Sequence, residues 1–379
     1  MDDLNADAGA PVADVHSGLH SEAGGLRAEH PGRAKNPVIK VRDLAWLEFA
    51  KPNLDRAELF ARDFGFSVAQ RTADALYLRG TWSRVPCLVI RKSERGGFVG
   101  PTFLADDRAD LDRLERALGT PVIPYLDGWA IEIADPAGIP IRIVAGLEAL
   151  PALPDQQPLV WNTGSAVARI DVAQRPAPQP ARVQRLGHVV LETPRFRRTL
   201  DWYLENLGMI VSDFLYLDDL RDRGPTMAFI RCDRGSVPTD HHTLAMHLGP
   251  GSGYVHSAYQ VTDLDAVAMG GEYLRGQGYD RVWGIGRHIQ GSQIFDYWRD
   301  PDKLMFEHFA DGDLFACDVQ PGWASMSASG LSQWGPPVTK DFLGTKLSPH
   351  LIKNVTSALR GETDLDPTVL RSLMKAMAP

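Results

Sequence analysis

The sequence predicts an α+β protein made of two tandem modules, each built from paired β-α-β-β-β units. Three observations lead to this fold class: a segment near Val41 is repeated near Val183, the two halves end in the same way, and each half contains a second helix among β-rich stretches. Self-similarity at this scale indicates duplicated supersecondary units.

The repeated segments open each half. They read VRDLAWLEFAKPNLDRAELFARDFGF and VQRLGHVVLETPRFRRTLDWYLENLGM. Each predicts a short apolar strand, a turn at Pro52 or Pro194, and an amphipathic helix. Gly65 and Gly208 stand where these helices should end, since glycine adopts the left-handed conformation that terminates many helices.

The closing segments of the halves also match. WAIEIADPAGIPIRIV and IFDYWRDPDKLMFEHF both predict strand, Asp-Pro turn and strand, around Asp135 and Asp300. A second helix should begin near Asp110 in the first half and near Asp263 in the second. Each half therefore predicts a doubled β-α-β-β-β unit.

Composition changes along the chain predict the division into domains. The first residues are rich in Asp, Ala, Gly and His and have little to bury, so we expect a disordered leader. A stretch rich in Pro and Gln separates the halves and predicts a linker. The expected parts are the leader 1–36, an N-terminal module 37–150 without metal, a linker 151–181, a catalytic C-terminal module 182–315, and a C-terminal extension 316–379.

Bulk properties exclude several classes of function. The net charge is -8 and no block of five or six Lys and Arg residues is present, which argues against a nucleic-acid partner. No apolar stretch is long enough to span a bilayer. Cys87, Cys232 and Cys317 form no CxxC pair, so neither a disulfide framework nor a thiolate zinc site is indicated, and we expect a reducing cytoplasm.

Three residues of the second half are candidate metal ligands. His188 lies in its first strand, His256 begins another strand, and Glu307 follows the Asp-Pro turn. Two imidazoles and one carboxylate suit non-haem iron(II) and leave positions for substrate and dioxygen, although zinc and manganese(II) accept the same ligand types. Taken singly, a histidine in an apolar strand is more often a hydrogen-bonded core residue.

The repeat strengthens the metal hypothesis. Aligning the halves by their turns and helices places Trp46 opposite His188, Phe103 opposite His256, and Arg142 opposite Glu307. All three candidate ligands are thus absent together from the first copy. A metal site made redundant in one copy predicts such a joint loss, whereas unrelated core histidines do not.

With these motifs the chain resembles the type I extradiol ring-cleaving dioxygenases of the vicinal oxygen chelate superfamily. The resemblance covers about residues 38 to 315 and rests on the GHVV motif at His188, the HSAYQV motif at His256, and Glu307 in the final strand. It implies a metal-free N-terminal module, iron(II) or manganese(II) in the C-terminal module, an aromatic diol and dioxygen as reactants, and a homo-oligomer.

The resemblance also implies roles for three further residues. His242, in the HHT motif, matches the acid/base histidine on the dioxygen side. His288, in the GRH turn, matches a histidine near the catechol, and Tyr297 matches a tyrosine that hydrogen-bonds a substrate oxygen. On this basis His241 should face away from the site, because neighbours in a strand point to opposite faces.

Simpler interpretations stand beside each of these. His241 and His242 can form an exposed pair, Tyr297 a half-buried strand residue, and His288 a loop residue. Gly291 departs from the family, since the members that cleave dihydroxybiphenyl carry an Asp there. The same fold also serves glyoxalase-like isomerases, hydrolases and non-catalytic binding proteins, which stay as rival functions.

Overall fold

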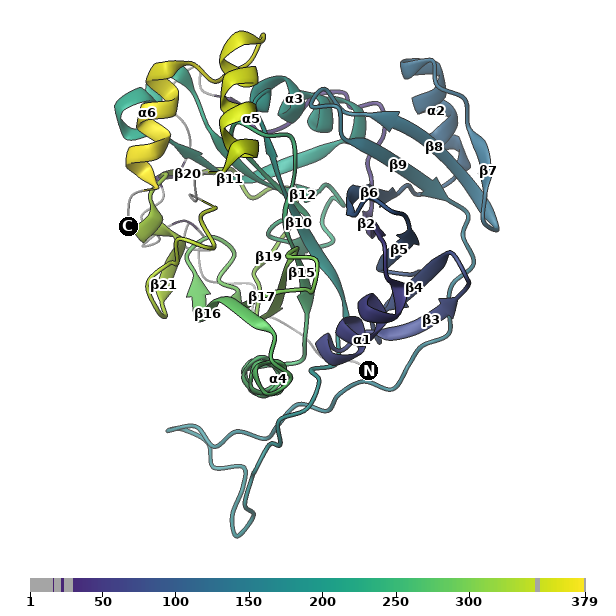
Figure 1. Ribbon diagram of the computed structural model, residues 1–379, viewed down its shortest axis with the longest axis vertical. Coiled ribbons are helices and arrows are strands. Elements are labelled where there is room, and N and C mark those ends of the chain that lie inside the picture. The colour runs from purple at the N-terminus through teal and green to yellow at the C-terminus, as the bar shows by residue number, and fades with distance from the viewer. Residues whose placement is uncertain (1–15, 17–21, 24–29, 345–347, 378–379) are drawn as a thin grey trace.

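The computed structural model describes residues 16, 22–23, 30–344 and 348–377. Two large β-sheets lie side by side, with helices packed against them (Figure 1). The first half of the chain contributes β2 (Asp43–Lys51), α1 (Leu54–Phe64), β3 (Ser67–Arg71), β4 (Ala75–Arg79), β5 (Leu88–Lys92), β6 (Gly97–Leu104), α2 (Arg108–Leu118), β7 (Ile123–Tyr125), β8 (Gly128–Ala134) and β9 (Pro140–Ala145).

The second half repeats this order of elements with small additions. It contributes β10 (Arg185–Thr193), α3 (Phe196–Leu207), β11 (Met209–Tyr216), the 3-10 helix η1 (Asp218–Arg223), β12 (Met227–Cys232), β13 (Thr239–Asp240), β14 (Leu244–Leu248), β15 (Gly253–Gln260), α4 (Leu264–Gly276), β16 (Asp280–His288), β17 (Ile294–Arg299), β18 (Met305–Ala310) and β19 (Leu314–Phe315).

The two sheets share one strand order. The first runs β3-β4-β5-β2-β6-β9-β8-β7, and the centre of the second runs β11-β12-β14-β10-β15-β18-β17-β16. Each strand of the second sheet is the counterpart of the strand at the same place in the first. Each half is therefore two β-α-β-β-β units, and the predicted α+β fold with two modules is confirmed.

The helix ends follow the predicted signals. Asn53 caps α1 through its side chain, and Asp263 caps α4 in the same way. Gly65 and Gly208 end α1 and α3 in the left-handed conformation, with φ of 110° and 62°. At Gly65 a side chain is also excluded by space, because a Cβ atom would lie 1.5 Å from the carbonyl oxygen of Ala181.

The leader and the extension add strands to the second sheet. They contribute β1 (Glu22–Ala23), β20 (Gly322–Ser325), η2 (Ala328–Leu331), β21 (Ser332–Trp334), α5 (Pro349–Arg360) and α6 (Pro367–Ala376). β1 pairs with β20, which pairs with β11, and His16 is buried. Most of the leader expected to be disordered lies outside the described residues, but His16 and β1 do not fit that expectation because they pack on the second sheet.

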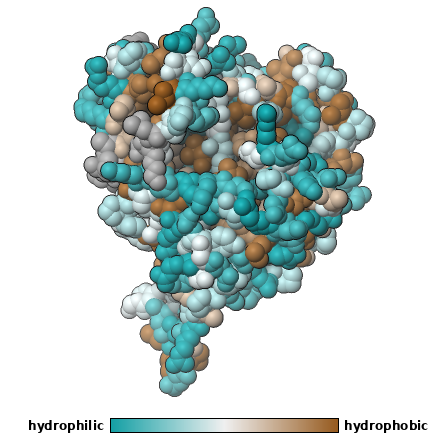
Figure 2. All heavy atoms as spheres, viewed as in Figure 1, coloured by the Kyte–Doolittle hydropathy of each residue, from teal (hydrophilic) through white to brown (hydrophobic). Residues whose placement is uncertain are grey.

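Residues 151–181 contain no helix or strand, and the middle of this segment projects from the body as an arm (Figures 1 and 2), whereas Asp155 and Ala181 at its ends contact the body. The arm is tied to α4 by a hydrogen bond from Trp161 Nε1 to Asp265, yet it exposes apolar side chains such as Val160 and Ile170. The boundaries of the linker and of the modules stay predictions. Among the helices that the structure describes, none combines the length and apolar character needed to cross a bilayer.

Buried contacts join the two halves. Lys51 of β2 forms an ion pair with Asp300 in the Asp-Pro turn of the second half, and both side chains are buried. His308 of β18 donates a hydrogen bond from Nε2 to the carbonyl oxygen of Phe64 at 2.7 Å, and its ring stacks on that phenyl ring. These contacts fix the β18 strand that carries Glu307.

Candidate metal centre

The three candidate ligands lie on three neighbouring strands. β10, β15 and β18 are adjacent in the second sheet, and they carry His188, His256 and Glu307 respectively. His188 is opposite Ala258, and Ala258 is opposite Glu307. His256 precedes Ala258 by two residues and therefore shares its face of the strand. The register of the three strands thus brings together three residues that are far apart in the chain.

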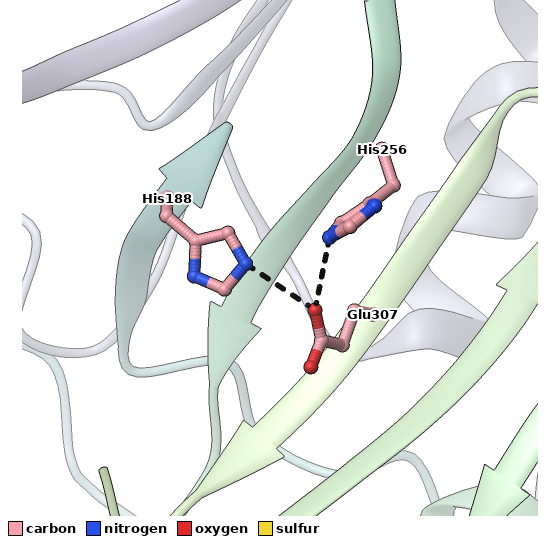
Figure 3. Close-up of side chains that lie close together, drawn as sticks. All are labelled: His188, His256 and Glu307. Carbon is pink, nitrogen blue, oxygen red and sulfur yellow. Dashed lines mark ion pairs between the residues drawn. The ribbon is translucent and has the colours of Figure 1, made fainter. Parts of the chain in front are cut away.

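Their side chains point toward one another (Figure 3). The Nε2 atoms of His188 and His256 each lie 3.4 Å from Oε2 of Glu307, and one ligand atom from each residue falls within 4.8 Å of the others. All three side chains are buried. Within the described part of the chain, neither oxygen of Glu307 has a hydrogen-bond partner.

A divalent cation fits this donor set. A buried carboxylate without hydrogen bonds is costly unless a cation compensates it. Burial alone would raise the pKa of Glu307, but the imidazoles of His188 and His256 outweigh burial and hold that pKa below its ordinary range. Burial lowers the pKa of His256 to about 4, although Glu307 opposes the change. At neutral pH the site therefore offers a carboxylate and a neutral imidazole, the forms that bind metal.

His242 lies beside this centre, in the loop just before β14. Its ring packs over the ring of His188 with centroids 4.0 Å apart, and burial lowers its pKa well below the ordinary value. The alternative of an exposed histidine pair is wrong, because His241 and His242 are both buried. His241 faces Asp213 and Phe315 rather than the metal centre, in agreement with the expectation that it faces away, and its Nδ1 lies 3.0 Å from Nδ1 of His242. Strand alternation is not the cause of this orientation, because neither residue lies in a strand.

His241 forms a hydrogen bond with Asp213 of β11, and Nε2 of His241 lies 2.6 Å from Oδ2 of Asp213. A carboxylate accepts, so His241 donates from Nε2. In a neutral ring its Nδ1 must then accept, and His242 must donate from Nδ1. The contacts thus leave Nε2 of His242 with its lone pair. The sequence pointed to no role for Asp213.

His288 and Tyr297 form a hydrogen-bonded pair at the same site. Nδ1 of His288 donates to the carbonyl oxygen of Leu331 at 2.7 Å, so its Nε2 accepts from the hydroxyl of Tyr297 at 2.8 Å. Tyr297 is fully buried and pairs with Glu307 across β17 and β18, which excludes the half-buried alternative. His288 is the last residue of β16 rather than a loop residue. Burial raises the pKa of Tyr297 well above its ordinary value, so the hydroxyl stays protonated.

The first module has no equivalent centre. Trp46 and Arg142 occupy the positions of His188 and Glu307, as the sequence predicted. The third prediction was wrong: Gly100, not Phe103, matches His256, because each is the fourth residue of its strand and the strand registers agree. In place of a metal set, Arg142 forms an ion pair with Glu48. All three positions still lack a ligand side chain.

Comparison with known proteins supports the same family. The chain is 30% identical over 332 residues to metapyrocatechase 2 of Cupriavidus necator, an alignment covering 84% of this chain and 97% of that protein. The chain belongs to the extradiol ring-cleaving dioxygenases. Residues 185–308 match the model of the Glyoxalase/Bleomycin resistance protein/Dioxygenase superfamily. The family resemblance and the expectation of an enzyme are thereby confirmed.

Other relatives of this dioxygenase are more distant. Biphenyl-2,3-diol 1,2-dioxygenase of Pseudomonas sp. KKS102 is 21% identical over 314 residues, covering 78% of this chain and 97% of that protein. The fold is shared with homoprotocatechuate 2,3-dioxygenase of Brevibacterium fuscum, in complex with 3,4-dihydroxyphenylacetate, at a TM-score of 0.66, 19% identity, and coverage of 83% and 95%. The fold is also shared with a Mn(II)-bound glyoxalase of Novosphingobium aromaticivorans, at a TM-score of 0.65 and 20% identity. This match covers 84% of this chain and 99% of that chain.

The dioxygenase has a cavity of about 330 Å³ at the candidate metal centre. His188, His256, His242, His288 and Tyr297 line it. Further lining residues come from the C-terminal extension. They are Met326, Ser327, Leu331, Asp341, Phe342, Leu343, Gly344 and Met377. His247 also lines the cavity from β14, while His308 points to the other side of its strand and bonds Phe64.

Gly291, the departure from the family pattern, lies next to His241. Its backbone is in the left-handed region, with φ of 80°, and a Cβ atom there would lie 3.2 Å from Nδ1 of His241. A larger side chain at this position would therefore press on the imidazole that bonds His242. Gly291 thus leaves the space that the His241 ring occupies, and an Asp side chain at position 291 would crowd that ring.

Proposed function

We propose that this enzyme opens the ring of a catechol-type diol beside its two hydroxyls, using dioxygen and an iron(II) ion held by His188, His256 and Glu307. The observation that carries the proposal is the convergence of two buried imidazole nitrogens on a buried carboxylate, whose oxygens find no hydrogen-bond partner among the described residues. When bound, iron(II) would lower the pKa of a coordinated hydroxyl and bring diol and dioxygen together.

His242 is proposed as the acid/base residue. The chain of contacts from Asp213 through His241 leaves Nε2 of His242 as an acceptor, so this nitrogen can take a proton from a hydroxyl and later return one. Its ring lies against His188, which places it at the edge of the proposed coordination sphere.

Tyr297 and His288 are proposed to orient the diol. The hydroxyl of Tyr297 is protonated and donates to His288, so its oxygen can accept a hydrogen bond from a hydroxyl of the diol near Glu307. Placing a reacting oxygen in one orientation lowers the entropic part of the barrier.

The reactants and the assembly are proposals of the same kind. The substrate would be a small aromatic diol, with dioxygen as second reactant, and manganese(II) would be the alternative metal. A homo-oligomer is supported by the apolar side chains that the arm exposes, such as Val167 and Ile170. A cytoplasmic location stays a prediction that rests on three unpaired cysteines.

Metal reconstitution tests the proposal. The protein is stripped of metal, loaded anaerobically with iron(II) or manganese(II), and supplied with catechol and 2,3-dihydroxybiphenyl in air. We expect a ring-fission product only in the metal-loaded samples and the higher rate with iron(II). His188→Ala should lose bound metal and activity together, whereas the control His350→Ala, on exposed α5, should keep both. An iron-loaded, active His188→Ala variant would remove His188 from the metal site.

A further inference from the structure

The cavity extends beyond the volume that a simple catechol needs. An apolar cavity of about 150 Å³ holds benzene, so about 330 Å³ leaves room for a ring substituent. Apart from the site histidines and Tyr297, the walls are mainly apolar, with Leu215, Met227, Phe229, Val255, Met305 and Phe342 among them. Such walls favour an apolar substituent over a hydrated one.

One cationic side chain reaches this part of the cavity. Arg299 is the single Lys or Arg among the described residues that line it. It stands two residues after Tyr297 on β17, so both side chains lie on the same face, about 7 Å apart along the strand. A guanidinium at this distance from the diol site could bind a carboxylate on the substrate, because Arg recognises carboxylates through paired hydrogen bonds.

Arg299 is already occupied by the protein itself. Its Nε donates to Oδ2 of Asp341 at 2.9 Å, its Nη2 donates to the carbonyl oxygen of Asp341 at 3.2 Å, and its Nη1 donates to the carbonyl oxygen of Lys303 at 2.7 Å. Asp341 belongs to the C-terminal extension and itself lines the cavity. Each guanidinium nitrogen therefore already has a partner, and the charge is balanced by one carboxylate.

We infer that Asp341 determines substrate specificity by neutralising Arg299, so that the enzyme selects catechols with a neutral, apolar substituent and discriminates against those with a carboxylate. This inference rests on the proposed function. A carboxylate entering the cavity would lose its hydration and find Arg299 already paired. Glu192, a second lining carboxylate that bonds the backbone nitrogen of Gly251, adds repulsion.

Paired substrates test the inference. The iron-loaded enzyme is assayed with 2,3-dihydroxybiphenyl, which carries an apolar substituent, and with 3,4-dihydroxyphenylacetate, which carries a carboxylate. We expect kcat/KM for the neutral diol to exceed that for the carboxylate by at least about 100-fold, in line with the cost of an unpaired buried charge. Asp341→Asn should raise kcat/KM for the carboxylate by about tenfold, mainly through a lower KM.

Two controls isolate the role of charge. Asp311→Asn removes a carboxylate from another arginine pair, that of Arg287, neither member of which lines the cavity, and it should leave the substrate ratio unchanged. Adding Arg299→Met to Asp341→Asn should abolish the gain for the carboxylate. If the gain persists in the double variant, a loosened wall rather than a freed guanidinium explains it, and the inference is wrong.

The outcome is separable from that of the proposed function. Equal kcat/KM for the two diols in the wild-type enzyme overturns the specificity inference but leaves ring cleavage intact. Failure to cleave any diol contradicts the proposed function instead. In that case the preference is measured by anaerobic titration of the two diols into the metal-loaded protein. The neutral diol should bind more tightly than the carboxylate-bearing diol, and equal affinities would overturn the inference.

Discussion

Replacing Asp296 by Asn should stabilise the protein in a pH-dependent way. Asp296 is fully buried on β17, next to Tyr297. Its Oδ2 accepts from Arg281 Nη2 and Trp298 Nε1, each at 2.9 Å, and its Oδ1 has no partner among the described residues. Burial raises the pKa of Asp296 from 3.8 to about 7, although Arg281 opposes the change. The fold therefore disfavours the ionised carboxylate.

The sign and size of the effect follow from this pKa. The pKa of Asp296 is higher in the folded than in the unfolded protein, so its ionisation lowers the free energy of unfolding. This loss is absent below about pH 4, grows as the pH rises to about 7, and stays constant above that pH. The two pKa values differ by about three, and a difference of one in pKa corresponds to about 1.4 kcal/mol. Ionisation of Asp296 therefore lowers the free energy of unfolding by about 4 kcal/mol at most. About 3 kcal/mol of this should develop between pH 5 and pH 8.

The assay is urea unfolding of metal-free wild-type protein and the Asp296→Asn variant at several pH values from 5 to 8. Asn cannot ionise, so the unfolding free energy of the variant relative to the wild type should rise by about 3 kcal/mol across this range. The weakened contact with Arg281 adds an offset that cancels between pH values. A difference between the two proteins that does not change with pH would refute the reasoning.

Three further perturbations address the site and the fold. His242→Ala should retain iron and lose about 100-fold or more in kcat, since it removes an acid/base and no ligand; metal analysis and steady-state rates decide, and parallel loss of iron would contradict the role. Tyr297→Phe deletes the hydroxyl that accepts from the diol and should lower kcat/KM by about tenfold with iron retained, so unchanged kinetics would exclude an orienting role. Gly65→Ala places a Cβ against the Ala181 carbonyl at a positive φ and should lower the unfolding free energy by more than about 1 kcal/mol, whereas an unchanged thermal midpoint would argue against that packing.

Local signals predicted the fold well because they act over short distances. Gly65 and Gly208 end their helices in the left-handed conformation, as the sequence indicated. The repeat placed His188 and Glu307 opposite Trp46 and Arg142, and the strand registers agree. Glycine stops and Asp-Pro turns are readable because each depends on the conformational preference of one or two residues.

The exact register of strand pairing was harder to predict from the sequence. Gly100 rather than Phe103 matches His256, because turns anchor the ends of an alignment but do not fix the hydrogen-bond register between them. The pairing of β6 and of β15 with its partner also departs from regular register at equivalent places in the two halves, and the sequence does not reveal such departures. Sequence similarity between the halves cannot resolve such shifts.

Contacts made by irregular segments could not be predicted. The alternation rule gave the wrong reason for the orientation of His241, because the rule holds only for regular strands, and it gave no sign of the contact between His241 and His242. Likewise, Asp341 and Phe342 enter the cavity wall from an extension without periodicity, so nothing local marks them as site residues. Their positions depend on tertiary packing of segments far apart in the chain.

The most direct test of the account uses dioxygen labelled with oxygen-18. Iron-loaded enzyme is mixed with a neutral catechol under the labelled gas, and oxygen uptake and product mass are measured together. The account predicts one dioxygen consumed per diol, with both labelled atoms in a ring-opened product before solvent exchange. Iron bound at the site without oxygen uptake, or a product that carries no label, would contradict it.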